Sequence, residues 1–411
     1  MGPRAVGPAD GSGRPSLASP LSAPEHQVLG ASTASNIVVQ WSGKATKSDA
    51  VAAQMLGLRK AAADDEGYPM ARASVMNLIA FAPQAAHEEL ARTSVDQLAF
   101  RHPSRAIVVS LQPAASFSLD AEVFLYRHPL ADHGLVYERA LLRAHGADPE
   151  GLDTLVIPLL IPHLQSFLWW LGDPQIDDPG LRSLGAICDR LVVDSAQAAA
   201  VRLRELAQLI EIGAPEPNQR VPPFARLVLG DLAWSRLDGF RSALVRVFDE
   251  GVRAEFLEGV TRVEIQGARG SRLPVTSAEV LFGGWLASRL GWTSPAWAPE
   301  GVTLKAGSRR VGLNFAGTRG LRPSADAPPL QGVRLEAEQG RRKLTLDLSA
   351  SYAEAHLVVS ETGMGQIVRT LPIPHMSETE ALSRELARIG RDLVYEDAML
   401  ASSRILAALG S

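Results

Sequence analysis

The stretch TLVIPLLIPHLQSFLWWLG, residues 154–172, carries no charged side chain. As a helix with a rise of about 1.5 Å per residue, it would reach about 28 Å, close to the thickness of a bilayer's hydrocarbon core. Pro158 and Pro162 would interrupt such a helix twice within about one turn. We therefore expect no membrane span here, but a proline-bounded loop followed by a buried strand over residues 165–172.

Two adjacent tryptophans stand in this strand. Side chains alternate along a strand, so Trp169 and Trp170 point to opposite faces and need two apolar environments. A sheet with helices on both faces provides them, and strand-like and helix-like segments alternate along this half of the chain. Only the strand-like segments over 117–129 and 133–146 follow one another without a clear helix, and they can form an antiparallel pair.

The second half of the chain has a different pattern. The segment GAPEPNQRVPPFARL, residues 213–227, is dense in proline and predicts a domain boundary. Beyond it, strand-like segments follow one another between residues 302 and 373 without helices, which predicts an antiparallel meander. Leu344, Leu346 and Leu348 alternate with polar residues, as a half-buried strand requires.

Several helix ends are marked in the sequence. Capping-box spacings predict helix starts at Thr276 with Glu279 and at Ser377 with Glu380. Single N-caps are predicted at Ser195 and Asp231. One face of the C-terminal helical segment is predicted to carry Leu382, Leu386, Ile389 and Leu393.

These patterns predict an α/β first domain with a mixed sheet covered by helices, and an α+β second domain with an antiparallel meander and C-terminal helices. The expected ranges are a disordered tail over 1–40, the α/β domain over 41–215 and the α+β domain over 216–411. The tail is rich in Gly, Pro, Ser and Ala and lacks the apolar core of a secretory signal. With neither a signal nor a membrane span, we expect a cytoplasmic protein.

The composition excludes some kinds of redox chemistry and gives no argument for a nucleic-acid partner. A formal net charge of −4 gives no argument for nucleic-acid binding, and no zinc spacing or aromatic-basic motif adds one. The chain has one cysteine, Cys188, which excludes an internal disulfide and a metal cluster built from cysteines. A buried structural thiol is favoured over a reactive one at this position.

The signatures of common enzymes are missing. The sequence has no G-x-G-x-x-G after a strand, no Walker loop and no G-x-S-x-G elbow. Arg269 and Arg272 lie in a glycine-containing loop without the spacing of a phosphate loop, and His163 has no acidic neighbour in sequence to orient it as a base. The sequence therefore predicts no catalytic residue, no metal site and no cofactor. The alternative is an enzyme that acts on a sugar phosphate through His163 and the Arg269 loop.

The tryptophans of the second half leave two explanations open. Trp234 and Arg236 lie in the segment DLAWSRL, and Trp285 and Trp292 lie in GGWLASRLGW. They pack inside the protein or contact a partner, since Trp and Arg are favoured anchors of interfaces. The two glycines before Trp285 cost about 1 kcal/mol each in a helix interior, a cost that is usually offset when another backbone packs closely there.

Four segments resemble one known family in their sequence and order: IPLLIPHLQSFLWWLG, CDRLVVDS, DLAWSRL and GGWLASRLGW. From about Ala45 to its end, the chain resembles the glucose-6-phosphate dehydrogenase assembly protein family, OpcA. The resemblance implies a non-catalytic adaptor that binds glucose-6-phosphate dehydrogenase, the NADP-dependent first enzyme of the oxidative pentose phosphate pathway. Such an adaptor promotes the assembly and activity of that enzyme.

The resemblance carries over no catalytic residue and no cofactor to this chain. Some members of the family are redox-sensitive through cysteines, but a single cysteine excludes an intramolecular switch here. We expect an allosteric activator whose partner surface lies on the second domain. The candidate partner-binding residues are Trp234, Arg236, Trp285 and Trp292.

Overall fold

The computed structural model describes residues 37–45, 47–66, 71–72, 74–127, 135–213, 223–249, 251–269, 275–319, 328–351, 354–373 and 375–410. Residues 1–36 of the expected tail, 214–222 of the proline-dense segment and 270–274 of the arginine loop lie outside these ranges. In the described part of the chain, no helix is both long and apolar enough to cross a bilayer.

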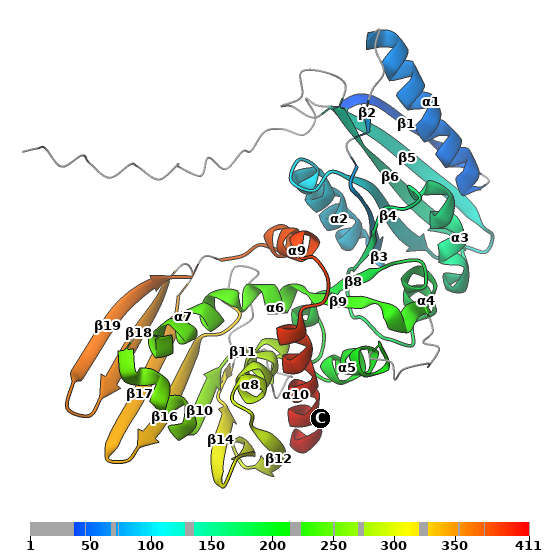
Figure 1. The fold of residues 1–411 in the computed structure, drawn as a ribbon. Coiled ribbons are helices and arrows are strands. Elements are labelled where there is room, and N and C mark those ends of the chain that lie inside the picture. Colours follow the sequence, from blue (N-terminus) through cyan, green and yellow to red (C-terminus); the bar gives the residue numbers. More distant parts are fainter. Residues whose placement is uncertain are drawn as a thin grey trace, which may run out of the picture. The chain divides into compact units, whose positions relative to one another are not determined.

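The α-helices are labelled in Figure 1, and short 3₁₀ turns lie between several of them. Their bounds are α1 (Ser48–Glu66), α2 (Ala85–Leu98), η2 (Pro149–Gly151), α3 (Leu152–Val156), η3 (Ile157–Leu159), α4 (Pro179–Gly185), η4 (Ser195–Gln197), α5 (Arg202–Gly213), η5 (Pro223–Arg226), α6 (Leu232–Arg236), α7 (Asp238–Asp249), η6 (Gly251–Gly259), α8 (Ser277–Arg289), α9 (Glu378–Ala387) and α10 (Leu393–Leu409).

The first sheet is mixed and has nine strands within the described ranges. Its order is β1 (Ile37–Ala45), β5 (Ser118–Arg127), β6 (Leu135–His145), β4 (Ser104–Gln112), β3 (Met76–Ala82), β7 (Ser166–Trp170), β8 (Arg190–Val193) and β9 (Val228–Asp231), with β2 (Ala71–Arg72) beside β6. The pairs β1–β5 and β5–β6 are antiparallel, and every neighbouring pair from β6 to β9 is parallel. The expected antiparallel pair and the α/β class are confirmed. The parallel part has the strand order of a doubly wound dinucleotide-binding sheet.

The Trp-Trp strand lies between two apolar layers, as predicted. Trp169 is fully buried among residues of α2 and α9, on one face of the sheet. Trp170 is buried on the other face with residues of α3 and α4, and its ring stacks on Phe81 at 4.2 Å between centroids. The uncharged stretch 154–172 therefore supplies a broken helical segment, a loop and a core strand.

The second sheet has eight strands within the described ranges. Its order is β12 (Thr293–Ala298), β13 (Gly301–Ala306), β14 (Arg309–Phe315), β10 (Val260–Gln266), β16 (Gly332–Gln339), β17 (Arg342–Ala350), β18 (Glu354–Glu361) and β19 (Gly365–Pro372). Strands β16 to β19 form the predicted antiparallel meander, and Leu344, Leu346 and Leu348 are buried along one face of β17. Strand β10 enters between β14 and β16 and runs parallel to β14, which the meander pattern did not predict. A separate pair is formed by β11 (Ala268–Arg269) and β15 (Thr318–Arg319).

The last helices return to the first sheet (Figure 1). Helix α9 packs beside α2, where Ser94 and Thr379 share a hydrogen bond of 2.8 Å and His102 bonds Ser383 at 2.8 Å. Helix α10 packs against α5 and α8. Strand β9 lies beyond residue 215 and pairs with β8 of the first sheet. The domain ranges 41–215 and 216–411 stay a prediction.

Local capping signals were confirmed at all of the predicted sites but one. Thr276 and Ser377 start α8 and α9 with complete capping boxes, and Asp231 caps α6. The prediction for Ser195 was wrong, because Asp194 caps the short turn η4 there and helix α5 begins only at Arg202. The side chain of Asp194 accepts a hydrogen bond from the N–H of Ala196, and the turn that it caps ends before α5 begins.

The predicted apolar face of the last helical segment was also wrong in part. Leu382 and Leu386 are buried, but Ile389 is 97% exposed and Leu393 is 65% exposed. Helix α9 ends at Ala387, and Gly390 adopts a left-handed backbone with φ of 70°. The chain turns at this glycine, so residues beyond it no longer continue the buried face.

Candidate functional site

The four candidate partner-binding side chains lie inside the protein. Trp234, Trp285 and Trp292 are 2%, 7% and 6% exposed. The side chain of Arg236 is 17% exposed and bonds Asp194 through Nη1 at 2.8 and 2.9 Å. This burial favours the packing explanation, and contact with a partner through these side chains stays a prediction.

Trp285 lies in the part of α8 that packs on α10. A Cβ atom added at the preceding Gly284 would collide with the backbone of Ala398 and with Ser402 in α10. Ser402 Oγ in turn donates a hydrogen bond to the carbonyl oxygen of Val280 at 3.0 Å. The glycine that weakens the helix locally is thus explained by close contact with a second backbone, as expected from the sequence.

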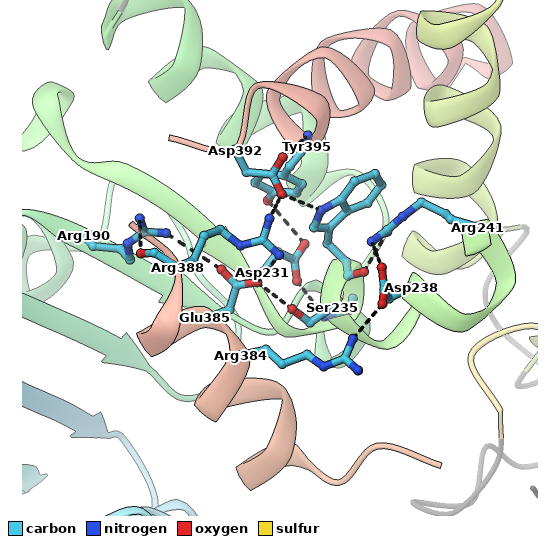
Figure 2. A network of polar contacts seen from close by, with 12 residues as sticks. Arg190, Asp231, Ser235, Asp238, Arg241, Arg384, Glu385, Arg388, Asp392 and Tyr395 are labelled. Atoms are coloured by element: carbon cyan, nitrogen blue, oxygen red, sulfur yellow. Dashed lines mark hydrogen bonds and ion pairs between the residues drawn. The ribbon is translucent and has the colours of Figure 1, made fainter. Parts of the chain in front are cut away.

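Trp234 belongs to a polar network that joins residues between 190 and 241 to residues between 384 and 395 (Figure 2). The network draws on β8, β9, α6, α7, α9 and α10, and we name it the junction network. Its members are Arg190, Asp231, Trp234, Ser235, Asp238, Arg241, Arg384, Glu385, Arg388, Asp392 and Tyr395.

Asp231 is the most deeply placed charge of the junction network. It ends β9 and caps α6, with Oδ1 accepting from the N–H of Ala233 at 2.9 Å and of Ser195 at 3.1 Å. Oδ2 accepts from the Tyr395 hydroxyl at 3.4 Å. The carboxyl is fully buried, and this burial, with the charge of Asp194 as a second cause, raises the pKa of Asp231 to about 7. At neutral pH this group therefore lies near its own titration point.

Trp234 fixes α6 to two other helices. Its Nε1 donates to Asp392 Oδ2 at 3.0 Å, and its ring lies against the ring of Tyr395. The Arg241 guanidinium lies 3.5 Å from the centre of the indole ring, and its Nη1 donates to the Trp234 carbonyl oxygen at 2.8 Å. Burial lowers the pKa of Arg241 to about 10. The indole N–H, the ring face and the backbone carbonyl of Trp234 thus all have partners inside the protein.

Glu385 extends from α9 toward the ends of β8 and β9. Its Oε1 accepts from Ser235 Oγ at 2.6 Å, and its Oε2 lies 3.9 Å from Arg190 Nη1. A Cβ atom at Gly230 would lie 2.6 Å from Oε2, so a larger residue there would displace this carboxylate. Burial is the main cause that raises the pKa of Glu385.

Arg190 holds the backbone between α9 and α10. Its Nη2 donates to the carbonyl oxygens of Arg388, at 3.1 Å, and of Gly390. Arg388 is paired with Asp392, and Arg391 makes two hydrogen bonds to Glu396, at 2.7 and 2.6 Å. We name residues 388–392 the α9–α10 turn.

A second carboxylate at the start of α9 lies close to the Arg236–Asp194 pair. Glu378 is half-buried, and burial followed by the charge of Asp194 raises its pKa to about 7, while Arg236 opposes this. Asp231 of the junction network and Glu378 at the start of α9, whose pKa values are both raised in part by the charge of Asp194, therefore both titrate near neutral pH.

The residues that follow β3 and end β4 differ from those of a dinucleotide-binding sheet. In a doubly wound sheet, glycines after the first strand let the backbone approach a dinucleotide pyrophosphate. Here the residues after β3 are Pro83 and Gln84, and β4 ends at Gln112 where an acidic residue would bind a ribose. Among the described residues, no three His, Cys, Asp or Glu side chains are grouped to hold a metal ion.

The alternative enzyme hypothesis rests on His163 and the Arg269 loop, and the structure describes the first but only part of the second. His163 is exposed on the loop before β7 with φ of 69°, and the Arg269 loop lies largely outside the described residues. Cys188 is half-buried, and burial raises the pKa of its thiol well above the usual range. Such a thiol is a poor nucleophile at neutral pH.

Sequence reasoning did not identify Arg190, Glu385 or Asp392 as site residues. One signal was present, since Arg190 stands in CDRLVVDS, a charged residue at the start of a buried strand. A charge in such a position needs a partner. The sequence gives no indication that this partner lies about 200 residues further along the chain.

Two family models match the chain in order. One is described as the N-terminal domain of the glucose-6-phosphate dehydrogenase subunit and matches residues 95–211. The other is described as the C-terminal domain of the same dehydrogenase subunit and matches residues 228–399. The second match contains α6, α9 and the α9–α10 turn, and the first contains β8 with Arg190.

Two cyanobacterial relatives named as candidate OxPP cycle protein OpcA are similar over much of this chain. The protein of Nostoc punctiforme is 26% identical over 335 residues, which cover 75% of this chain and 66% of its own length. That of Synechococcus elongatus is 24% identical over 278 residues, covering 64% of this chain and 58% of its own. The chain thus spans less than two thirds of the length of these relatives.

Among solved structures, a levoglucosan dehydrogenase in complex with NADH and L-sorbose is similar at a TM-score of 0.43. The two chains are 10% identical, and the match covers 83% of this chain and 98% of that one. A score this low does not establish a shared fold or a shared ligand.

Proposed function

Because the chain belongs to the glucose-6-phosphate dehydrogenase assembly protein family, OpcA, we propose that it is a non-catalytic adaptor of glucose-6-phosphate dehydrogenase. It binds this enzyme and promotes its assembly and activity in the oxidative pentose phosphate pathway. The observation that carries the proposal is the match of both family models, in chain order, over both sheets.

Two features of the structure support a role without chemistry. The turn after β3 has proline and glutamine where a dinucleotide-binding sheet has glycines. Most charged residues of the junction network are buried and paired with groups of the same chain, so they do not line an open cleft. A protein with these features acts through the surface that it presents.

An adaptor activates an enzyme by binding its active form more tightly than its inactive form. A preference of about 1.4 kcal/mol shifts that equilibrium about tenfold. The effect saturates when all of the enzyme is bound, and it is reciprocal. Substrates that favour the active dehydrogenase must therefore tighten the complex by the same factor.

A titration tests the proposal. The dehydrogenase of the same organism is titrated with this protein while the mass of the complex and the rate of NADPH formation are both measured. We expect the rate to rise and to saturate along the binding curve. A complex without any change in rate would remove the activator role, and the absence of a complex would contradict the proposal as a whole.

A control separates the adaptor from the alternative enzyme. The pure protein is incubated with NADP and glucose 6-phosphate without added dehydrogenase. The adaptor should give no turnover above the blank. Turnover that persists at constant specific activity through purification would favour an enzyme that acts on a sugar phosphate.

A further inference from the structure

Three large apolar side chains are exposed within six consecutive residues at the α9–α10 turn and the start of α10. Ile389 is 97% exposed, Leu393 is 65% exposed and Val394 is 37% exposed. Single exposed apolar residues are common on protein surfaces, but apolar residues gathered in one place mark interaction sites. Their exposure follows from the turn at Gly390, which takes them away from the buried face of α9.

The turn that carries these residues is fixed by hydrogen bonds from buried side chains. Arg190, whose side chain is 5% exposed, donates to two of its carbonyl oxygens. Trp234 Nε1 holds Asp392, and Asp392 Oδ1 caps α10 by accepting from the N–H of Tyr395 at 3.1 Å. A turn fixed in this way loses little conformational entropy when a partner binds, which favours affinity.

The arginines of the α9–α10 turn are more exposed than their own carboxylate partners, and one turn further along α10 the exposed Asp397 is paired with Arg289. The side chains of Arg388 and Arg391 are 31% and 41% exposed. Their carboxylate partners Asp392 and Glu396 are 11% and 8% exposed, and Glu385 is 2% exposed. The surface offered to a partner is therefore apolar and is bordered at the turn by two arginines, which is complementary to an apolar cavity with carboxylates on the matching side.

We propose that residues 388–394 are the segment that docks on glucose-6-phosphate dehydrogenase, in an apolar cavity of that enzyme bordered by acidic side chains. The inference rests on the proposed function and names its contact surface. It also gives the buried residues of the family-like segments a role. Arg190 of CDRLVVDS and Trp234 of DLAWSRL are positioning residues that fix the docking turn without touching the partner.

The test compares two exposed apolar positions of this chain. Ile389→Asp places a charge in the docking segment, and Val368→Asp places one on β19 of the second sheet, where the side chain is 65% exposed. Each full-length variant and the parent are titrated against the native dehydrogenase, and thermal unfolding is followed in parallel. We expect Ile389→Asp to weaken binding about tenfold or more and Val368→Asp to weaken it less than about twofold, with unchanged unfolding midpoints.

The outcomes separate this inference from the proposed function. If the parent and both variants bind equally well, the docking surface is wrong while the adaptor function stands. An equal loss in both variants overturns it as well, since any added carboxylate would then act alike. If the parent forms no complex, both proposals fail. Sedimentation of the protein alone adds one further outcome: a dimer that Ile389→Asp dissociates would mean that a second copy of this chain covers the segment, which also overturns the inference.

A second pair of variants tests the role of the supporting residues. Trp234→Phe keeps an aromatic ring against Tyr395 but removes the hydrogen bond to Asp392. We expect it to weaken binding of the dehydrogenase, whereas Trp285→Phe, which trims a buried ring packed on Phe282 in α8, should not. Equal affinities for both variants at equal stability would overturn the positioning role of Trp234.

Discussion

Replacing Asp231 by Asn should make the protein more stable than the parent at neutral and higher pH. The carboxyl of Asp231 is fully buried, and its pKa is raised to about 7 by burial and by the charge of Asp194. In the unfolded chain the same group titrates near 3.8, its usual value. Between these two pH values, the folded state holds a proton that the unfolded state has released. Stability contributed by the protonated form is therefore complete below about pH 4 and is lost as the pH rises to about 7.

The size of this loss follows from the two pKa values. One pKa unit corresponds to about 1.4 kcal/mol, and the interval from 3.8 to about 7 is about three units. The parent should thus lose on the order of 4 kcal/mol through this group alone. Asparagine has no proton to lose, and its side-chain oxygen can still accept from the N–H of Ala233 and of Ser195. The variant should equal the parent near pH 4 and exceed it by up to about 4 kcal/mol above pH 7.

Urea unfolding at a series of pH values measures this difference directly. Glu378, whose pKa is also raised to about 7, contributes to the pH dependence of both proteins and cancels in the comparison. The matched control is Asp238→Asn, which changes a half-exposed carboxylate of the same network. It should not gain stability at neutral pH, because it removes the ion-pair partner of Arg241 and Arg384. A constant difference in stability between Asp231→Asn and the parent across the whole pH range would refute the reasoning.

Three further variants test the packing and the redox role. Trp169→Ala should lower the free energy of unfolding by about 3–5 kcal/mol, because the side chain is fully buried, and a loss below about 1 kcal/mol would contradict its place in the core. Gly230→Ala should destabilise the protein by about 1–3 kcal/mol, because the added methyl group displaces Glu385, whereas Gly57→Ala in α1 meets open space and should stabilise slightly in the same denaturation assay. Cys188→Ser should leave activation of the dehydrogenase equal under oxidising and reducing conditions, and a redox response present only in the parent would show that the thiol has a regulatory role.

The features that sequence predicted correctly depend on neighbours within a few residues. The alternation of Trp169 and Trp170 follows from strand geometry alone. The capping box at Thr276 joins atoms three residues apart and formed as expected. Leu346 of the meander alternates with polar neighbours and is buried, as that pattern predicts. In these places the local preference and the final packing agree.

The failures occurred where a local pattern met a competing local signal. The apolar spacing from Leu382 to Leu393 fits one continuous helix, but Gly390 lies inside it. Periodicity gives every position equal weight, so it did not register the glycine at which the chain turns. At Ser195 the competing residue was Asp194, whose carboxylate captures the N–H of Ala196 at 3.2 Å.

The site was less accessible to sequence reasoning than the fold, because its contacts join distant residues. Trp234 and Asp392 are 158 positions apart, and Arg190 and Gly390 are 200 positions apart. A tryptophan and an arginine in short motifs are equally compatible with an interface and with a core. Only the position of α9 over the first sheet shows that these side chains are used internally.

Arg190 and Trp234 belong to segments that resemble the family, but both side chains are buried and cannot form the partner surface directly. A side chain such as Arg190 costs free energy in the interior unless every donor finds an acceptor, and a hydrophobic residue of similar size would often be as stable. Fold stability alone is therefore a weak reason for an arginine at this position. Its two bonds to the backbone of the α9–α10 turn set the conformation of a segment that presents Ile389 to solvent. A requirement for one fixed turn conformation explains three features together: the buried Arg190, the bond of Trp234 to Asp392 and the glycine at position 230 next to Glu385. All three keep the exposed surface at the turn in one conformation.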